Sequence, residues 1–525
     1  MLTAFQTQTK DDFPAKVSDA LQKEGYRLIE NRHATEAYRP GLEWSVPGIG
    51  TVLGGCRICR LSGGAGTWMC VVPHWGIPGV ELSPTDRSRV DKAVTTSAEF
   101  SATGRMNECL RLIQATGYPS LPESSPQSAA SAGKVILGSG SKPLGAISLP
   151  ALKGSPLRPA TQTHLLCTSQ THSKSRLDGF VAKISSALVS MGVPVAARSL
   201  DFDNFHESLN RLTPEKVQDQ SVVLIGVPGS KTDPQPIPEE TLAAFQIMDR
   251  LDIPYRIFGQ PSLDSHYPAN DMAPYLAMLL GASLREVELA PTFAETLFLG
   301  LDLGHPLHHG DSVPVLSVID SRGSLLAWWR GRQIRDETLR RESTSRATTW
   351  LLDWLRQTGR QPKDVIILRD GKLNKNDGLD EMASAMPCPA TLVEVVKNPV
   401  PLVRHEGSLA RPGTWIEVVP GRDGFLQMPE PSVKGHIAHP LRLRKAAKDD
   451  LHSLEDIAGA VFTLCHAPTL GLRIPGAPAP IYWSDGLSAN SGMDLQFRGL
   501  NHVPHHDEIL GMECRSSGSE TSANK

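Results

Sequence analysis

Two apolar stretches of the chain carry an aspartate where a buried strand is expected. Asp302 lies among leucines within residues 297–303, and Asp370 follows the apolar residues 365–368. An ionised carboxylate within or at the end of a buried strand is costly unless it is paired or binds a cation. Two such aspartates in one domain therefore suggest a shared metal ion, which is the chemistry of a metal-dependent nuclease core.

Each aspartate also has a simpler interpretation. A single buried aspartate is often capped by neighbouring backbone N–H groups, and Asp370, which precedes Gly371, fits a turn at the end of a strand. Only the pair favours a metal site, because two carboxylates on adjacent strands can bridge two divalent ions about 4 Å apart. Oxygen ligands suit Mg²⁺ or Mn²⁺, so we expect two ions of one of these metals.

Such a site needs further acidic ligands, and two segments offer them. Glu337 lies about midway between the two aspartates in an arginine-rich segment, with Asp336 and Glu342 as close alternatives. Asp485 follows the partly aromatic segment 480–484. Glu337 can instead be an exposed acid at the start of a helix, and Asp485 can be a turn residue.

The elements around these acids follow the order of an RNase H-like core. Three successive strands, a long helix and a further strand are predicted at residues 297–303, 313–319, 324–329, 343–358 and 364–368. This order places the centre of the first strand beside the end of the last. Asp302 and Asp370 should therefore lie side by side, in a domain that we expect to span residues 289–513.

A second domain is expected at residues 164–288, where strands and helices alternate. The predicted strands cover residues 164–167, 221–227 and 255–258, and the predicted helices cover residues 177–191, 238–251 and 271–281. Such alternation indicates an α/β fold with a doubly wound, mainly parallel sheet. Residues 1–118 are expected to form an α+β region without an assignable motif, residues 119–163 a linker rich in Ser, Ala, Gly and Pro, and residues 514–525 a disordered tail.

Composition and charge limit the class of protein. The 525-residue chain is 40% hydrophobic and 21% charged, which is typical of several globular domains. It has neither a run of about 18 apolar residues nor a secretory signal, so we expect a cytoplasmic protein with no membrane partner. The net charge of −3 argues against a generally basic nucleic-acid binder. Arginines nevertheless gather in residues 322–360 and basic residues in 434–448, which favours a polyanionic partner over a merely solvated surface.

One group of cysteines has a spacing that can hold zinc. It consists of Cys56, Cys59, Cys70 and His74. Residues 54–72 fit better as a β-hairpin that turns at residues 63–66, with the cysteines as small strand residues, and we favour this interpretation. The other cysteines are scattered, as expected in a reducing compartment.

Several segments resemble the PIWI module of prokaryotic Argonautes. The resemblance rests on residues 299–305, 368–371, 395–397, 435–441 and 480–485. Nuclease-active members of the family use an Asp-Glu-Asp-Asp tetrad whose glutamate lies on a mobile loop between the first two aspartates. By motif, Asp302, Asp370 and Asp485 match the aspartates, and Glu337 lies in the interval of the glutamate. The resemblance therefore implies that the three aspartates bind metal and that Glu337 completes the catalytic site by loop closure.

The same resemblance makes residues 164–288 a MID domain, which in the family holds the 5′ end of the guide. Tyr275 and Leu279 stand where relatives carry lysines, so the need for a 5′-phosphate stays open. Tyr255 and Arg256 are expected to contact a phosphate, together with free N–H groups at the start of the helix near Asp271.

Basic residues elsewhere are candidates for contacts to the nucleic-acid backbone. They are Lys397, Arg404, Arg442 and Arg444, for which a solvated surface is the simpler alternative. The residues before 164 leave too little room for the full N-terminal, linker and PAZ set of a long Argonaute, so we expect no complete PAZ domain.

The resemblance implies a guide-directed endonuclease that hydrolyses a target strand paired with a short guide, in host defence against invading nucleic acid. One alternative is a nuclease-silent, guide-directed binding module that activates a separate effector protein. Another is an unguided RNase H-like nuclease. Guide and target can each be DNA or RNA, because both present the same phosphates.

Overall fold

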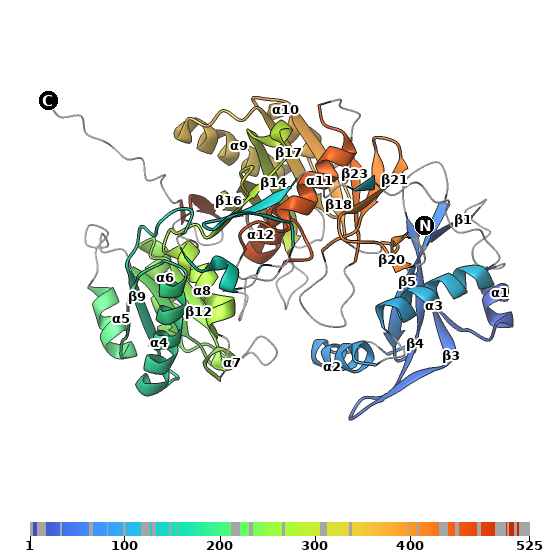
Figure 1. Ribbon diagram of the computed structural model, residues 1–525, viewed down its shortest axis with the longest axis horizontal. Helices are drawn as coiled ribbons and strands as arrows, with labels where there is room; N and C mark the ends of the chain where they lie inside the picture. Colours follow the sequence, from blue (N-terminus) through green and yellow to red (C-terminus); the bar gives the residue numbers. More distant parts are fainter. Residues whose placement is uncertain are drawn as a thin grey trace. The chain divides into compact units, whose positions relative to one another are not determined.

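The computed structural model divides the chain into two compact units, Met1–Ser131 with Val395–Phe462 and Ala132–Glu394 with Thr463–Lys525 (Figure 1). The residues that it describes are 4–7, 17–31, 34–61, 67–80, 82–97, 101–116, 127–128, 133–145, 147, 149–154, 156–211, 221–229, 235–264, 268–304, 312–334, 339–397, 400–405, 408–429, 439–446, 451–469, 474–488, 500, 503–508 and 512–513.

The first unit contains a five-stranded antiparallel sheet in the order β1-β5-β4-β3-β2. Its strands are β1 (Ala4–Thr7), β2 (Arg27–Asn31), β3 (Ala34–Val46), β4 (Gly50–Leu61) and β5 (Thr67–Gly76). Strands β4 and β5 form the predicted hairpin, with Cys59 opposite Cys70. Cys56 is three residues from Cys59 on one strand, so the two side chains point to opposite faces. The cysteines therefore do not converge on a zinc ion, and the hairpin interpretation is confirmed.

Three helices accompany this sheet, as expected for an α+β region. They are α1 (Ser18–Lys23), α2 (Pro84–Thr95) and α3 (Ala102–Ala115). Ser83 and Ser101 cap α2 and α3, because each side chain accepts a hydrogen bond from a backbone N–H of the first helical turn. Buried residues of α3, such as Leu112, share a hydrophobic cluster with Ile58 and Val71 of the hairpin.

A later part of the chain also belongs to the first unit. Its elements are β19 (Arg404–His405), β20 (Ser408–Leu409), β21 (Thr414–Val419), β22 (Asp423–Leu426), β23 (Leu441–Lys445) and most of α11 (Leu454–Leu464). Strands β23, β22 and β21 are neighbours, and β21 pairs with β6 (Gln127–Ser128). Val396, Val403 and Phe425 share a buried cluster with Cys70 of β5. This packing explains why residues 395–462 group with the N-terminal region and not with the rest of the predicted 289–513 domain.

The second unit begins with a small antiparallel sheet in the order β13-β7-β8. It consists of β7 (Lys134–Leu137), β8 (Gly140–Pro143) and β13 (Arg285–Glu288), and a 3₁₀ helix, η4 (Leu149–Leu152), follows β8. Val135 and Leu137 are buried in it. The prediction of a linker over residues 119–163 is therefore wrong for residues 134–152, because these residues pair and pack with the end of the next domain.

A four-stranded parallel sheet follows, as predicted for residues 164–288. Its order is β10-β9-β11-β12, made of β9 (His164–Ser169), β10 (Ala196–Ser199), β11 (Ser221–Gly226) and β12 (Tyr255–Phe258). The strand order reverses between β9 and β11, so this sheet has a topological switch point.

Helices cover both faces of this parallel sheet. They are α4 (Lys174–Ser190), α5 (Phe202–Asn210), α6 (Glu239–Arg250), α7 (Gln260–Asp264) and α8 (Pro268–Leu279). Phe245 of α6 packs with Phe205 of α5 and Tyr255 of β12 in one hydrophobic cluster. On the other face, the ring of Phe180 in α4 lies 4.8 Å from that of Phe258. The predicted doubly wound arrangement is confirmed.

The remaining sheet of the second unit has the strand order of an RNase H-like core. Its strands follow the order β25-β24-β16-β15-β14-β17-β18. They are β14 (Thr296–Gly304), β15 (Val313–Ile319), β16 (Leu325–Arg330), β17 (Asp364–Asp370), β18 (Ala390–Val396), β24 (His505–Asp507) and β25 (Met512–Glu513). Strand β14 is antiparallel to β15 and parallel to β17, and β15 is antiparallel to β16. The prediction for these strands is confirmed.

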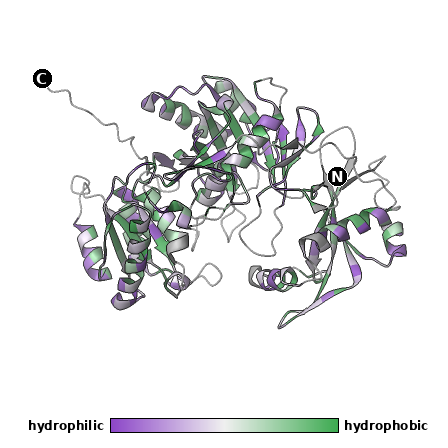
Figure 2. Ribbon diagram, viewed as in Figure 1, coloured by the Kyte–Doolittle hydropathy of each residue, from purple (hydrophilic) through white to green (hydrophobic). Residues whose placement is uncertain are grey.

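Helices complete the RNase H-like part. They are η6 (Pro291–Phe293), α9 (Arg341–Thr358), α10 (Leu379–Ala385) and α12 (Ala479–Ser488). Helix α9 connects β16 to β17 and ends at Gly359, whose φ of 62° is a conformation that favours glycine. Figure 2 shows hydrophobic residues concentrated in the strands and hydrophilic residues along helices such as α5 and α9. No helix among the residues described above is long and apolar enough to cross a membrane.

Candidate active site

Asp302 and Asp370 lie at the carboxyl ends of two neighbouring parallel strands. The register of β14 and β17 pairs Leu301 with Arg369, so the next residue of each strand is one of the two aspartates. Parallel strands in register bring residues at equivalent positions to the same edge of a sheet. The predicted pairing of the two strands is confirmed, and a metal ion shared by the two carboxylates stays a prediction.

Asp302 is buried, with 7% of its surface exposed. Its Oδ1 atom accepts a hydrogen bond from the N–H of Leu303 at 2.7 Å, which is the local capping considered as the simpler interpretation. The same oxygen lies 3.9 Å from Nη1 of Arg369. A backbone N–H group and a guanidinium therefore both lie near this oxygen of Asp302.

Helix α12 covers the face of β14 on which the Asp302 side chain lies. A Cβ added to Gly300 would lie 2.0 Å from the carbonyl oxygen of Pro480, and one added to Gly304 would lie 1.6 Å from Oγ of Ser488. Gly300, Asp302 and Gly304 alternate along the strand and therefore share one face. The two glycines let the helix approach closely on either side of Asp302.

Asp485 lies within α12 and is exposed. The alternative of a turn residue is therefore wrong. Along the helix, Asp485 lies between Pro480, which approaches Gly300, and Ser488, which approaches Gly304. Among the described segments of the chain, no group of three or more His, Cys, Asp or Glu side chains is arranged to hold a metal ion. Asp302, Asp370 and Asp485 thus do not form a closed three-carboxylate cage.

The predicted loop acid, Glu337, and its alternative Asp336 lie outside the described residues. Glu342 lies in the first turn of α9, is 73% exposed at its side chain and forms an ion pair with Arg346. The role of Glu337 stays a prediction.

Glu394, a buried acid that the sequence interpretation missed, supports the segment after Asp370. It lies in β18, is 2% exposed, and its Oε1 accepts a hydrogen bond from the N–H of Leu373 at 2.8 Å. Burial lowers the pKa of Arg369, and the charges of Asp302, Asp370, Asp377 and Glu394 oppose that shift. Glu394 thus accepts a hydrogen bond from the segment after Asp370 and favours the charged form of Arg369. A carboxylate inside the apolar run 391–396 was the available signal, by the same reasoning as for Asp302.

Replacing Glu394 by Ala is expected to lower the free energy of unfolding by about 1–3 kcal/mol, because it leaves the Leu373 N–H without this acceptor. Glu394→Gln keeps an acceptor oxygen and should lose less than half as much. Chemical denaturation measures both, with Glu381→Ala as the control, since Glu381 forms an exposed ion pair with Arg341 worth about 0–1 kcal/mol. Equal stability of Glu394→Ala and the wild type would show that the contact contributes nothing.

The phosphate contact predicted for Tyr255 is wrong. The Tyr255 ring is fully buried, stacks on Phe245 at 5.3 Å, and its hydroxyl donates a hydrogen bond to Asp249 Oδ1 at 2.9 Å.

Arg256 points to the other face of the sheet. It is 9% exposed, and its guanidinium lies 4.6 Å from the centre of the Tyr275 ring. Burial lowers the pKa of Arg256, and its contact to a phosphate stays a prediction.

Tyr275 and Leu279 stand at the two positions where the resemblance leads us to expect lysines. Both side chains are fully buried in α8. Burial raises the pKa of Tyr275, so this residue offers a neutral ring and hydroxyl at a place where a lysine would offer a charge. The N–H groups near Asp271 are not free ends as predicted, because α8 begins earlier, at Pro268.

The nucleic-acid contact predicted for Arg442 is also wrong. Arg442 is 5% exposed, and its Nε and Nη2 atoms donate to the two carboxylate oxygens of Asp423 at 2.9 and 2.5 Å. This buried bidentate pair is internal to the sheet formed by β22 and β23. Arg444 and Lys397 are half-buried and stay candidates, whereas the side chain of Arg404 lies outside the described part.

Comparison with known proteins identifies the fold. No protein-family model and no curated protein matches the chain. Among solved structures, Drosophila Piwi is similar over 97% of this chain and 86% of its own, with 11% identity and a TM-score of 0.66. An Argonaute of Marinitoga piezophila in complex with a 5′ OH guide RNA is similar over 91% and 85%, with 10% identity and a TM-score of 0.62.

A third similar structure carries DNA. It is the Clostridium butyricum Argonaute bound to a guide DNA and a 19-mer target DNA, similar over 85% of this chain and 64% of its own, with 12% identity and a TM-score of 0.60. The protein therefore has the fold of Argonaute and Piwi proteins, with a MID-like parallel sheet and a PIWI-like, RNase H-like sheet. This is the fold that the sequence resemblance implied.

Proposed function

We propose that the protein is a guide-directed endonuclease of the Argonaute type. A short DNA or RNA guide would pair with a target strand, and a phosphodiester of that target would be hydrolysed at Asp302 and Asp370. The observation that carries this proposal is the position of the two aspartates at adjacent strand ends of an RNase H-like sheet. Host defence against invading nucleic acid is the role that we propose for this activity.

The residues at the two strand ends fit a hard divalent cation. Both offer carboxylate oxygens, which Mg²⁺ and Mn²⁺ prefer as ligands. Asp302 and Asp370 would hold the metal, and Asp485 would be an accessory ligand. Glu337 would complete the site. The bound metal would supply an activated water and stabilise the leaving oxygen.

Guide binding in this proposal rests on the MID-like and PIWI-like parts together. Argonautes with this fold bind guide RNA or guide DNA. Arg444, Lys397 and Arg256 would contact the backbone by charge, while base pairing would select the sequence, so the protein itself should show little base preference. Because lysines are replaced by Tyr275 and Leu279, we propose that the 5′ end is held with less charge than in a pocket built from lysines.

One observation favours a second candidate, a guide-directed binding module without nuclease activity that signals to an effector protein. Within the described residues, the acids do not form a group of three that can hold a metal. In this alternative Asp302 is a capped structural residue, held by the Leu303 N–H and Arg369.

The test begins with the nucleic acids that copurify with the full-length chain, which are sequenced to define the guide. The purified protein is then loaded with that guide and mixed with a labelled complementary target in Mg²⁺, Mn²⁺ or EDTA. Cleavage at one position, dependent on both guide and metal, supports the nuclease. Tight guided binding without cleavage supports the binding module, and cleavage without a guide supports an unguided nuclease.

A further inference from the structure

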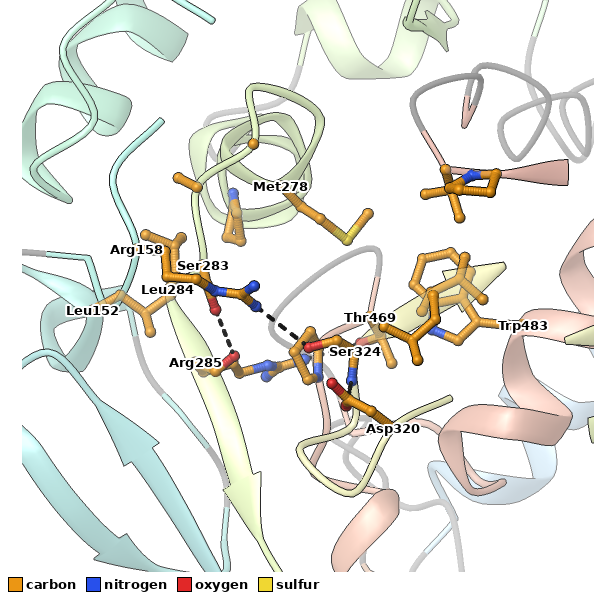
Figure 3. Close-up of a pocket in the computed structure, with 18 of the residues that line it drawn as sticks. Leu152, Arg158, Met278, Ser283, Leu284, Arg285, Asp320, Ser324, Thr469 and Trp483 are labelled. Carbon is orange, nitrogen blue, oxygen red and sulfur yellow. Dashed lines mark hydrogen bonds between the residues drawn. The ribbon is translucent and has the colours of Figure 1, made fainter. Parts of the chain in front are cut away.

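A cavity of about 350 Å³ lies in the second unit, away from the acids of the candidate active site (Figure 3). Its walls come from the end of α8 and the start of β13, the turn between β15 and β16, and α12. This volume lies within the range of pockets that bind small organic ligands. Nothing in the proposed guide-directed cleavage uses it.

The cavity lies at the opposite end of the RNase H-like strands from Asp302. Asp302 is paired with Val315, and the turn that lines the cavity begins five residues later, at Asp320. At about 3.4 Å per residue, this separation is roughly 17 Å along the strand. A ligand in the cavity therefore does not contact the strand ends that carry the two aspartates.

The cavity is also remote from the edge of the parallel sheet at which ligands of such folds bind. Ligands bind at the carboxyl ends of the strands. The cavity is lined by Gly281 and Ala282, next to Leu280, whose carbonyl accepts a hydrogen bond from the N–H of Thr161, just before β9 begins. It thus lies at the amino edge of this sheet and is a separate site.

Arginines dominate the charged groups of the cavity wall. Arg158, Arg285 and Arg360 line it, against the single carboxylate of Asp320. Asp320 accepts hydrogen bonds from the N–H groups of Arg322 and Ser324, at 3.0 and 2.8 Å, and thereby holds the turn. Glu286, outside the wall, lies 3.1 Å from Arg158 and 3.5 Å from the exposed Arg322. The three lining arginines outnumber the acids Asp320 and Glu286, so the cavity favours an anion.

Arg285 is the buried cation of this group. It is 6% exposed, and its Nη2 atom donates to the hydroxyl of Thr469 at 3.0 Å. Burial lowers its pKa to about 10, which still leaves the guanidinium charged at neutral pH. Arg285 lines the cavity, so an anion bound there would interact with its charge.

Another part of the wall is apolar. Met278, Leu284 and Trp483 contribute to it, and Figure 3 shows the Met278 side chain extending from α8 toward the side on which Trp483 lies. An indole and a thioether provide flat, polarisable surface for a ring. The cavity thus combines a cationic part with an apolar part.

We propose that this cavity binds a small organic anion in which a phosphate or carboxylate is joined to a flat apolar ring. The anionic group lies against Arg158, Arg285 and Arg360, and the ring lies against Met278 and Trp483. Guanidinium groups suit either acid, because their N–H donors match two oxygens of one anionic group.

Isothermal titration of the full-length protein with three probes tests this assignment. Phenyl phosphate carries both parts, inorganic phosphate only the anion, and phenol only the ring. Phenyl phosphate is expected to bind most tightly, with each of the other two at least about tenfold weaker. Equal affinity for phenol overturns the anionic assignment, and equal affinity for inorganic phosphate overturns the ring assignment. Absence of phenyl phosphate binding at millimolar concentration overturns the site itself.

Variants at exposed positions keep the test independent of folding. Arg158→Ala and Arg360→Ala, whose side chains lie at exposed parts of the wall, are each expected to weaken phenyl phosphate binding about tenfold. Arg322→Ala is the matched control, because Arg322 is charged, exposed and near Glu286 but does not line the cavity. If all three variants weaken binding equally, the effect is general electrostatics and the proposed contacts are absent. Guided cleavage is a separate measurement, so failure here leaves the proposed function intact.

Discussion

Replacing Asp302 by Asn is expected to lower the rate of guided target cleavage by about 100- to 1000-fold and to leave guide binding unchanged. Asparagine has the size of aspartate and keeps an oxygen that can accept the Leu303 N–H, so the local fold should persist. It lacks the negative charge that a divalent metal requires. Asp370→Asn should have a similar effect, because Asp370 ends the neighbouring strand. Single-turnover cleavage of a labelled target measures the rate, and filter binding measures guide retention.

Asp353→Asn is the control for this pair of variants. Asp353 lies on α9, is 45% exposed at its side chain and forms an ion pair with Arg356, so its loss should change neither rate nor stability by much. Wild-type cleavage by both the Asp302 and the Asp370 variants would refute the metal-dependent mechanism. Equal loss in all three variants would point to a general loss of folded protein.

The sequence predicted best those strands that are mostly apolar and bounded by polar or turn-forming residues. Tyr255–Phe258 and Val313–Ile319 have the predicted bounds because mostly apolar runs mark strands buried on both faces, even where Arg256 or Ser317 stands within the run. Strand β10 was not predicted, because Ala196–Ser199 is a short edge strand without an apolar run. Helix α5 was missed although Phe202, Phe205 and Leu209 form a buried stripe, since polar residues fill the positions between them.

Pairing between distant segments was the part of the fold that local patterns could not predict. Val135 pairs with Val287, and Cys70 packs with Phe425, in each case across more than a hundred residues of sequence. A Ser- and Gly-rich composition around Val135 therefore indicated a linker. The distant partners turn such short segments into parts of a sheet or core, so composition alone gave the wrong assignment for residues 134–152.

The candidate site was predictable only where position follows from strand order. Asp302 and Asp370 lie near the ends of neighbouring strands because these strands are parallel and in register, whatever the side chains around them. Tyr255 was misassigned because alternation cannot distinguish ligand-facing from core-facing residues in a strand buried on both faces. Glu394 was missed because its function lies in a hydrogen bond to Leu373, twenty-one residues earlier in the chain.

Replacing Arg442 by Ala is expected to lower the free energy of unfolding by about 3–5 kcal/mol. The change removes the guanidinium that donates two hydrogen bonds to Asp423 and leaves that carboxylate, 5% exposed, without its charge partner. Burying an unpaired charge costs more than the pair itself contributes, so the loss should exceed that of an exposed ion pair. Chemical denaturation of the full-length chain measures the change.

Arg444→Ala is the matched variant, because Arg444 lies two residues further along β23 and is only half-buried. It should change stability by no more than about 0.5 kcal/mol, while nucleic-acid affinity falls if its predicted backbone contact exists. The double change Arg442→Met with Asp423→Leu removes both buried charges and should recover most of the stability lost in Arg442→Ala. A stable Arg442→Ala variant with weakened nucleic-acid binding would instead restore Arg442 to the nucleic-acid interface. Comparing the two variants thus separates a charge that holds the sheet together from one whose contact to a phosphate is predicted.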